Sequence, residues 1–212
     1  MIQIKRFVFN HFQTNTYLVY DDEGRCLVID PACSGSREEN LFSAFMETNH
    51  LQIDKVFLTH CHVDHLLGVS FMESTFGKSP YMHQKGMPVY ENAPEFAFVY
   101  GLKLGSLPKK VSFFEDEDVF QIGNMEFTIA YTPGHVDGSV CIISHQLETV
   151  FAGDVLFRES IGRTDLPTGD FDTLMNSIKT KLFVLPGNYI VLPGHGPETS
   201  IGYELLNNPF IE

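Results

Sequence analysis

Four short motifs rich in histidine, aspartate and glycine each follow an apolar run typical of a β-strand, and this placement constrains the fold more than any other feature. Strands bring distant segments side by side, so the ends of several strands can direct side chains to one point. The sequence therefore predicts that five of its nine histidines and two of its aspartates converge. The motifs are His60-Cys61-His62-Val63-Asp64-His65, Thr132-Pro133-Gly134-His135, Gly153-Asp154 and Pro193-Gly194-His195.

The first motif indicates a metal centre. His60 and His62 are two positions apart, so in an extended turn they project to the same side and can bind one metal ion. Asp64 and His65 follow at a predicted helix start, which suggests a second site. Imidazole and carboxylate ligands suit Zn, Fe or Mn, and an aspartate between two such ions can bridge them through its two oxygens. Asp154 is the candidate bridge.

A single histidine is more often a surface or hydrogen-bonded residue than a ligand, but the coincidence of four strand-end motifs reverses that expectation. Cys61 is interpreted as a packed bystander, because a thiol directed away from its two neighbours on an extended stretch cannot share their metal. The histidines without a comparable neighbourhood are His11, His50, His83 and His145.

Two arginines, Arg158 and Arg163, follow the candidate bridge closely. We predict them to bind substrate, because an arginine near the mouth of the site can hold a carboxylate through two parallel hydrogen bonds. The alternative is that Arg163 pairs with Asp165 and only stiffens the loop, since most such pairs are structural.

The local patterns predict a strand-rich, mixed α/β chain forming a single domain over residues 1–212. Strands are expected at 2–9, 16–20, 26–29, 55–59, 111–114, 125–131, 139–143, 149–152 and 189–192. Helices are expected at 38–49, 65–76 and 171–183, with Asp170 or Asp172 capping the last. Residues 85–110 are hardest to place, because prolines and glycines interrupt an apolar run; this segment is either a lid or a surface loop.

Charge and composition exclude several classes of partner. The net charge of −13 would repel a polyanion, so nucleic acid is not expected as substrate or partner. The four cysteines form no CxxC pair, and the N-terminus shows no signal-peptide pattern, which favours a cytoplasmic protein. No apolar run approaches the roughly 20 residues needed to cross a membrane. The oligomeric state is left open.

The same motifs carry a resemblance to a known family. Through residues 59–65, 132–135, 153–154 and 193–198, the chain resembles the metallo-β-lactamase-fold superfamily and, within it, the glyoxalase II-like hydroxyacylglutathione hydrolases. The resemblance implies an αββα sandwich of two packed mixed sheets flanked by helices, with two divalent metal ions, zinc above all, at one edge. It also implies the ligand partition: His60, His62 and His135 on the first ion, Asp64, His65 and His195 on the second, and Asp154 bridging.

A closer resemblance is to short bacterial members with the loop that stands here as Gly162-Arg163-Thr164-Asp165-Leu166-Pro167. Longer members carry a C-terminal helical extension with basic residues for glutathione, which this sequence lacks. The expected reaction is hydrolysis of a small-molecule thioester such as S-lactoylglutathione, in which a metal-activated hydroxide attacks the carbonyl. Asp64 is expected to act first as a ligand and also to orient the water.

Three alternatives remain open from the sequence. A glutathione persulfide dioxygenase of the same superfamily would use one iron and the residues equivalent to His60, His135 and Asp154. A β-lactamase is disfavoured by the carboxylate at Asp154 and by the absence of an export signal. A non-catalytic binding module is disfavoured because all seven ligand positions are filled.

Overall fold

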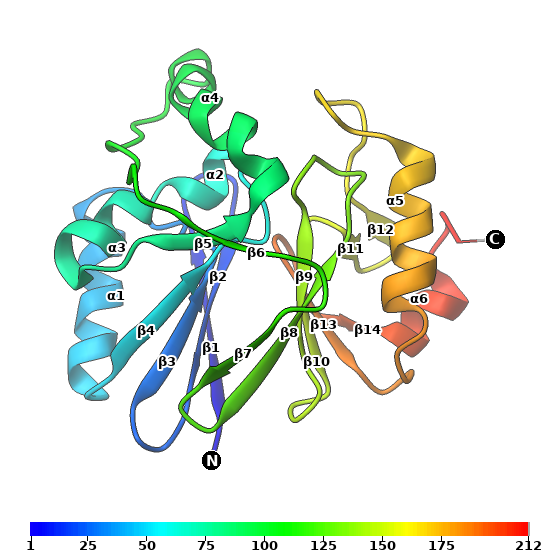
Figure 1. Cartoon of the computed structure of the whole chain (residues 1–212), viewed down its shortest axis with the longest axis horizontal. Coiled ribbons are helices and arrows are strands. Elements are labelled where there is room, and N and C mark those ends of the chain that lie inside the picture. Colours follow the sequence, from blue (N-terminus) through cyan, green and yellow to red (C-terminus); the bar gives the residue numbers. More distant parts are fainter. Residues whose placement is uncertain (212) are drawn as a thin grey trace.

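The computed structural model describes residues 1–211 and shows two six-stranded mixed sheets packed face to face, with helices on both outer sides (Figure 1). This is an αββα sandwich, so the fold class expected from the sequence is confirmed. Buried strands of both sheets are rich in Val, Ile, Leu and Phe, as strands covered on two faces require.

The first sheet has the order β1-β2-β3-β4-β5-β6, antiparallel from β1 to β3 and parallel from β3 onwards. The parallel step from β3 to β4 requires a crossover, which helix α1 (Ser36–Thr48) provides. The strands are β1 (Gln3–Phe9), β2 (Thr14–Tyr20), β3 (Arg25–Ile29), β4 (Gln52–Phe57), β5 (Pro80–His83) and β6 (Ser112–Phe114).

The second sheet has the order β14-β13-β10-β9-β8-β7. Within it, β10 and β13 are parallel neighbours, so their carboxyl ends lie together at one edge. The strands are β7 (Val119–Ile122), β8 (Met125–Tyr131), β9 (Val140–Ser144), β10 (Thr149–Gly153), β13 (Ile190–Pro193) and β14 (Thr199–Ser200). A separate hairpin consists of β11 (Leu156–Phe157) and β12 (Ser160–Ile161).

Helices cover both sandwich faces (Figure 1). Beside the first sheet lie α1 (Ser36–Thr48), α2 (Val63–Leu66), α3 (Val69–Phe76), the 3-10 turn η1 (Gln84–Gly86) and α4 (Met87–Val99). Beside the second sheet lie α5 (Phe171–Ser177), the π turn η2 (Ile178–Leu182) and α6 (Ile201–Asn207). Asp170 caps α5 as one of the two expected residues, because its carboxylate accepts a hydrogen bond from the amide of Thr173 at 2.7 Å.

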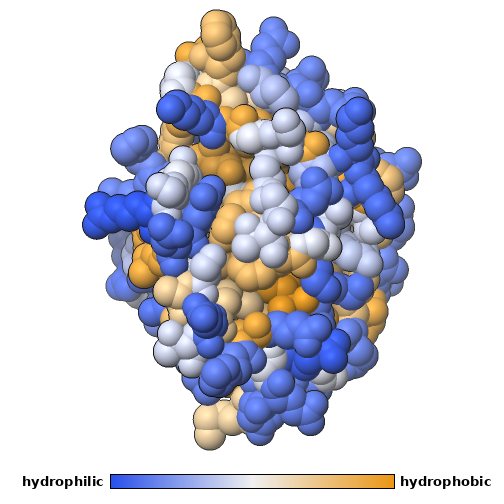
Figure 2. All heavy atoms as spheres, turned by 90° about the vertical axis from the view of Figure 1, so that its left-hand side faces the viewer, coloured by the Kyte–Doolittle hydropathy of each residue, from blue (hydrophilic) through white to orange (hydrophobic). Residues whose placement is uncertain are grey.

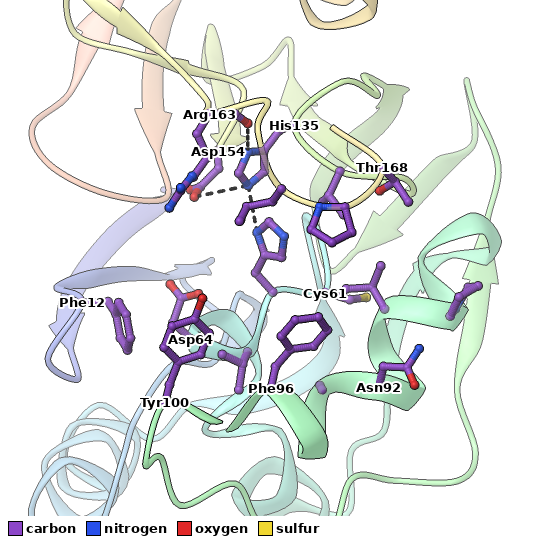
Figure 3. A pocket seen from close by; sticks show the side chains of 18 of the residues that line it. Phe12, Cys61, Asp64, Asn92, Phe96, Tyr100, His135, Asp154, Arg163 and Thr168 are labelled. Atoms are coloured by element: carbon purple, nitrogen blue, oxygen red, sulfur yellow. Dashed lines mark hydrogen bonds and ion pairs between the residues drawn. The ribbon is translucent and has the colours of Figure 1, made fainter. Parts of the chain in front are cut away.

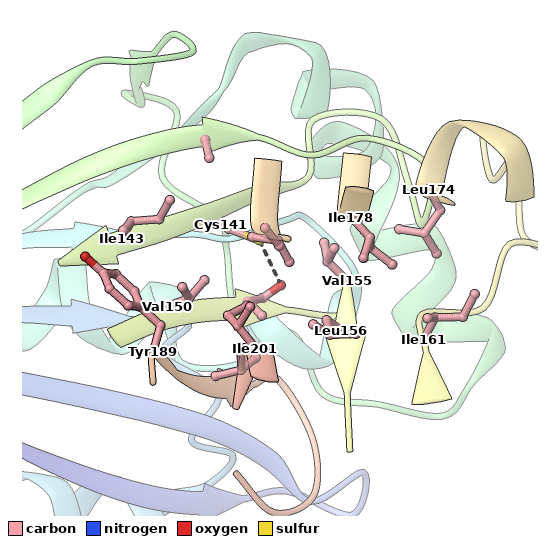
Figure 4. Close-up of a cluster of buried hydrophobic side chains, with 14 of the residues drawn as sticks. Cys141, Ile143, Val150, Val155, Leu156, Ile161, Leu174, Ile178, Tyr189 and Ile201 are labelled. Carbon is pink, nitrogen blue, oxygen red and sulfur yellow. Dashed lines mark hydrogen bonds between the residues drawn. The ribbon is translucent and has the colours of Figure 1, made fainter. Parts of the chain in front are cut away.

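Three apolar layers hold the sandwich together. Between the sheets, Phe57, Phe127 and Phe151 are fully buried. Outside the first sheet, Phe42 of α1 and Met72 of α3 pack on β2 and β3. A third layer fills the space between the second sheet and α5, η2 and α6 (Figure 4). Within residues 1–211, no helix is long and apolar enough to cross a membrane.

The structure corrects two expectations about helices. Residues 85–110 are not irregular throughout, because α4 fills much of the segment with Tyr90, Ala93 and Ala97 as its buried face and Pro94 inside it. The helix expected at 65–76 is divided into α2 and α3. The amide of Gly68 donates to the carbonyl of Pro31 at 2.8 Å, a contact outside the helix, and this ends α2.

Candidate metal centre

The strand ends of both sheets bring the predicted ligands to one edge of the sandwich. Two of the histidines follow β4, and the next two ligands lie in α2. The remaining three follow β8, β10 and β13 in the second sheet. Two backbone hydrogen bonds between the sheets fix this edge. The amide of Val140 donates to the carbonyl of Thr59 at 2.8 Å, and the amide of Asn15 donates to the carbonyl of Gly194 at 2.7 Å. The residues are His60, His62, Asp64, His65, His135, Asp154 and His195.

His60, His62 and His135 form the first ligand set. One ring nitrogen of each lies within 4.8 Å of the others, as three ligands of one ion would. Nε2 of His135 lies 2.9 Å from Nδ1 of His62. Nε2 of His60 is buried and has no hydrogen-bond partner among the described residues. A buried polar atom of this kind is costly unless a partner binds it.

Asp64, His65 and His195 form the second set, with ligand atoms also within 4.8 Å of one another. Nε2 of His195 lies 3.2 Å from Oδ2 of Asp64 and 3.3 Å from Nε2 of His65. His65 is fully buried, whereas the side chain of His195 is 27% exposed. Two of the three residues of the second set are only partly buried, against one of three in the first, so the second set lies nearer the solvent.

Asp154 stands between the two sets. Its Oδ2 lies 3.7 Å from Nε2 of His135 and 3.5 Å from Nε2 of His195, and its Oδ1 lies 3.5 Å from Nε2 of His65. Oδ1 is buried without a hydrogen-bond partner within the described residues. One carboxylate thus faces ligands of both sets, which is the position that a bridging ligand takes.

Backbone and side-chain acceptors orient four of the histidines. For His60 the partner is the Thr59 hydroxyl, whose oxygen lies 3.1 Å from Nδ1. Nδ1 of His135 lies 2.8 Å from the carbonyl oxygen of Arg163, and Nδ1 of His195 lies 3.0 Å from that of Phe12. Nδ1 of His65 lies 2.9 Å from Oδ2 of Asp30. An Nδ1–H that donates to such an acceptor leaves the Nε2 lone pair free for a metal ion.

Asp30 is a residue of this site that the sequence reasoning missed. It is buried, and it accepts hydrogen bonds from the amide of Thr59 at 2.7 Å and from the Thr59 hydroxyl at 2.6 Å. Asp30, His60 and His65 also have one ligand atom each within 4.8 Å of one another, but the oxygens of Asp30 are already engaged by donors, so we assign Asp30 to the orientation of His65. It follows the apolar strand β3 directly, and this is the same strand-end signal that marked the other motifs.

Burial and charge divide the histidines into two groups. Burial lowers the pKa of His60 well below its usual value, and it lowers that of His62 to about 4, so both rings are neutral at pH 7. Burial also opposes protonation of His195, but hydrogen bonds to Asp154 and Asp64 raise its pKa to about 9. A cation in the second set would therefore replace a proton on His195.

Two glycines leave room for the centre. A Cβ on Gly194 would lie 2.2 Å from Oδ1 of Asp154 and 2.8 Å from Cε1 of His65. Gly153 has a φ of +50°, and a Cβ there would lie 2.4 Å from Oγ1 of Thr59. Any larger residue at either position would displace a ligand or the strand end that carries it.

The donor set fits two divalent cations. Neutral imidazoles and carboxylates are the ligands of Zn, Fe and Mn, and two carboxylates offset part of the charge of two such ions. Unsatisfied buried atoms at His60 and Asp154 lie where a cation would contact them. The first ion would contact His60, His62 and His135, the second Asp64, His65 and His195, with Asp154 shared.

A pocket of about 460 Å³ opens above the ligands (Figure 3). Its floor includes His62, Asp64, His135, Asp154 and His195. One wall is α4, which lies in residues 85–110, the segment for which the sequence indicates either a lid or a surface loop. The other walls come from the loop after β1 and the loop after β12, and the lining residues outside the floor are Phe12, Cys61, Val63, Pro88, Val89, Asn92, Ala93, Phe96, Tyr100, Val136, Arg163, Leu166, Pro167 and Thr168.

The two arginines predicted to bind substrate occupy different places. Arg163 lines the pocket, but its guanidinium makes two hydrogen bonds to Asp165, at 2.7 and 2.8 Å. The Arg158 guanidinium carbon lies 5.0 Å from the ring centre of Tyr203 in α6. Arg158 is not among the described residues that line the pocket.

Comparisons with known proteins agree with this fold. A model of the metallo-β-lactamase superfamily matches residues 10–195. The chain is 36% identical over 202 residues to the hydroxyacylglutathione hydrolase GloC of Haemophilus influenzae, covering 94% of this chain and 93% of that protein. The di-iron-bound structure of TTHA1623 is 35% identical with a TM-score of 0.87, covering 98% of this chain and 100% of that one. The structure of BLEG-1, described as a B3 metallo-β-lactamase, is 31% identical with a TM-score of 0.87, covering 99% of both chains.

Proposed function

The chain belongs to the metallo-β-lactamase superfamily, and from this premise we propose that it is a two-metal thioester hydrolase of the glyoxalase II type. The reaction splits S-lactoylglutathione, or a related acyl thioester, into a hydroxy acid and a thiol. The observation that carries the proposal is the pair of three-residue ligand sets that share Asp154 at the floor of a pocket. The likeness to the relative named as a hydroxyacylglutathione hydrolase supports the thioester.

The side chains of this site hold and orient the reacting groups. Two divalent cations, when bound, supply Lewis acidity and a water of lowered pKa for attack on the carbonyl. Asp30 fixes the ring of His65, and the hydroxyl of Thr14 donates to Oδ2 of Asp64 at 2.9 Å.

No side chain of the pocket is needed as a nucleophile. Cys61 lines the pocket, but burial raises the pKa of its thiol, so it stays protonated and unreactive at neutral pH. The departing thiolate of a thioester is a good leaving group, so it needs little help from a general acid. The site accordingly needs no general acid beside the departing sulfur.

Two other reactions have specific support. Iron in the structure of one relative makes an iron-dependent persulfide dioxygenase the first of these candidates. That relative holds two irons, however, and a single iron on His60, His135 and Asp154 would leave the second ligand set without a role. The relative described as a β-lactamase makes hydrolysis of a β-lactam the other candidate.

One set of assays separates these reactions. Protein loaded with zinc or with iron is given S-lactoylglutathione, with the released thiol measured by Ellman's reagent; glutathione persulfide in an oxygen electrode; and nitrocefin. We expect thiol release that disappears in the Asp154→Ala variant and no comparable oxygen uptake or nitrocefin cleavage. Oxygen uptake with persulfide and no thioester cleavage would replace the proposal with the dioxygenase, and nitrocefin cleavage alone would replace it with the lactamase.

A further inference from the structure

We infer that the pocket selects thioesters that carry an uncharged, apolar group, and that it disfavours the charged glutathione tail. The inference rests on the proposed thioester hydrolysis and names the substrate class of that same site. It depends on the lining of the pocket above the floor, on the pairing of Arg163, and on the apolar side chains at the pocket mouth.

The pocket offers almost no charge to a bound tail. Above the floor, the described lining residues with polar side-chain groups are Asn92, Tyr100 with its hydroxyl, Arg163 and Thr168; only Arg163 is charged, and the others are apolar or, like Cys61, a buried thiol. Glutathione carries two carboxylates and one ammonium group. A carboxylate moved from water to an apolar wall without a partner is strongly destabilised, so the tail gains little from this pocket.

Among the described residues that line the pocket above the floor, the one cationic side chain, Arg163, is already engaged. The guanidinium of Arg163 holds both carboxylate oxygens of Asp165, and the hydrogen bond to Asp165 raises the pKa of Arg163. A substrate carboxylate would have to compete with Asp165 for this arginine. The ion pair is exposed, with 60% of the Arg163 side chain accessible, so it adds little to folding stability. The carboxylate of Asp165 nevertheless neutralises the charge of Arg163.

Helix α4 and the loop after β1 surround the mouth with apolar side chains. Phe96 and Tyr100 of the α4 end reach toward the floor from one side, and Phe12 stands at another (Figure 3). All three keep much of their surface exposed, Phe12 44%, Phe96 41% and Tyr100 58%. Apolar side chains also gather at the upper end of the molecule, over α4 (Figure 2). An apolar group bound here would remove this surface from water, which is favourable.

The volume suits such a group. About 460 Å³ lies within the range of about 300–1,000 Å³ usual for small-molecule sites. The apolar group belongs either to the thiol part or to the acyl part of the thioester, because both extend from a carbonyl at the floor. In both cases the substrate is a thioester with an apolar group, and the experiment below shows whether the thiol part or the acyl part carries it.

Two substrate series test the inference on the metal-loaded protein. In the first, the lactoyl group is kept and the thiol is glutathione, N-acetylcysteamine or 2-phenylethanethiol. In the second, N-acetylcysteamine is kept and the acyl group is lactoyl, butanoyl or octanoyl. We expect kcat/KM for the best apolar substrate to exceed that for S-lactoylglutathione about ten-fold or more, equivalent to about 1.4 kcal/mol. The series that shows the gain identifies the source.

Matched variants place the effect on the pocket wall. Phe96→Ala is expected to lower kcat/KM for the apolar substrate about ten-fold more than kcat/KM for S-lactoylglutathione, whereas Phe98→Ala, on the same helix but 85% exposed and outside the lining, changes neither. Asp165→Asn frees Arg163 and is expected to lower KM for S-lactoylglutathione alone. Asp172→Asn, an equal change of charge in α5, is the control.

The outcomes separate this inference from the proposed function. If S-lactoylglutathione has the highest kcat/KM and Phe96→Ala affects all substrates equally, the apolar selection is wrong while thioester hydrolysis stands. If the metal-loaded protein cleaves no thioester of either series, both the inference and the proposed function are wrong.

Discussion

Replacing Asp30 with asparagine is expected to remove the second metal ion and leave the first. Oδ1 of Asp30 accepts from the amide of Thr59, and Oδ2 accepts from the Thr59 hydroxyl and faces Nδ1 of His65 at 2.9 Å. In the variant, an amide nitrogen replaces Oδ2 and can only donate. His65 must then accept at Nδ1 and carry its proton on Nε2, the atom that faces Asp64 and Asp154. That tautomer cannot bind a metal through Nε2.

The size of this effect follows from the contacts. Loss of a partner that orients a metal-bound histidine usually weakens metal binding about 10- to 100-fold. The first set meets Asp30 only indirectly. The hydrogen bonds of His62 and His135 do not involve Asp30, and Nδ1 of His60 lies 3.1 Å from the Thr59 hydroxyl that donates to Asp30, so the first ion should be affected less than the second. Exchange of a buried charged acceptor for a neutral group costs about 1–3 kcal/mol of folding stability, so the variant should still fold.

Elemental analysis after dialysis against a weak chelator measures the result. We expect close to two ions per chain in the parent protein, close to one in Asp30→Asn, and thioester hydrolysis lowered about 10- to 100-fold. Asp21→Asn is the matched control, because Asp21 is also a buried carboxylate that accepts backbone amides, from Glu23 at 3.0 Å and Arg25 at 2.9 Å, away from the centre. Two tightly held ions in Asp30→Asn would refute the tautomer argument.

Three further predictions test the centre and the packing around it. Asp154→Ala should lose both ions or nearly all turnover, whereas Cys61→Ala should keep both; equal activity in the Asp154 variant and the parent would remove the bridge. Gly194→Ala should reduce metal content with a native far-UV circular dichroism spectrum, because its Cβ would lie 2.2 Å from Oδ1 of Asp154; unchanged metal content would show that the carboxylate can move. Ellman's reagent should label no thiol of the native protein even at pH 9, because burial raises the pKa to about 12 for three of them, and four thiols after denaturation; rapid native labelling would contradict the buried placement of Cys26, Cys33, Cys61 and Cys141.

Most of the sheet framework could be predicted from the sequence, because buried strands appear as short apolar runs bounded by turn residues. Five short strands were missed, β5, β7, β11, β12 and β14, which have two to four residues each and no clear alternation. Helix α4 was missed because Pro88, Pro94 and Gly101 suggest loops. Its buried face consists of Tyr90, Ala93 and Ala97, of which two are small, so the apolar periodicity is weak.

The convergence of the seven candidate ligands could be predicted because five follow strand ends and Asp64 and His65 come directly after two of these at a helix start, and the structure brings them together. Asp30 carries the same strand-end signal, but it was passed over because no histidine or glycine stands beside it in the sequence, and only the fold places it beside His65. The position of Arg158 over Tyr203 also depends on the tertiary structure, because the partner lies 45 residues away in α6. Sequence distance from Asp154 was therefore a poor guide to the pocket lining.

The most direct test of the two-metal centre is an anomalous difference map from crystals of the metal-loaded protein, measured at the absorption edge of the bound metal. We predict two peaks in each chain, with Asp154 in contact with both. The first peak should lie about 2.0–2.2 Å from nitrogens of His60, His62 and His135. The second should lie at a similar distance from Asp64, His65 and His195. A single peak at full occupancy, with the second set making only hydrogen bonds, would contradict the account.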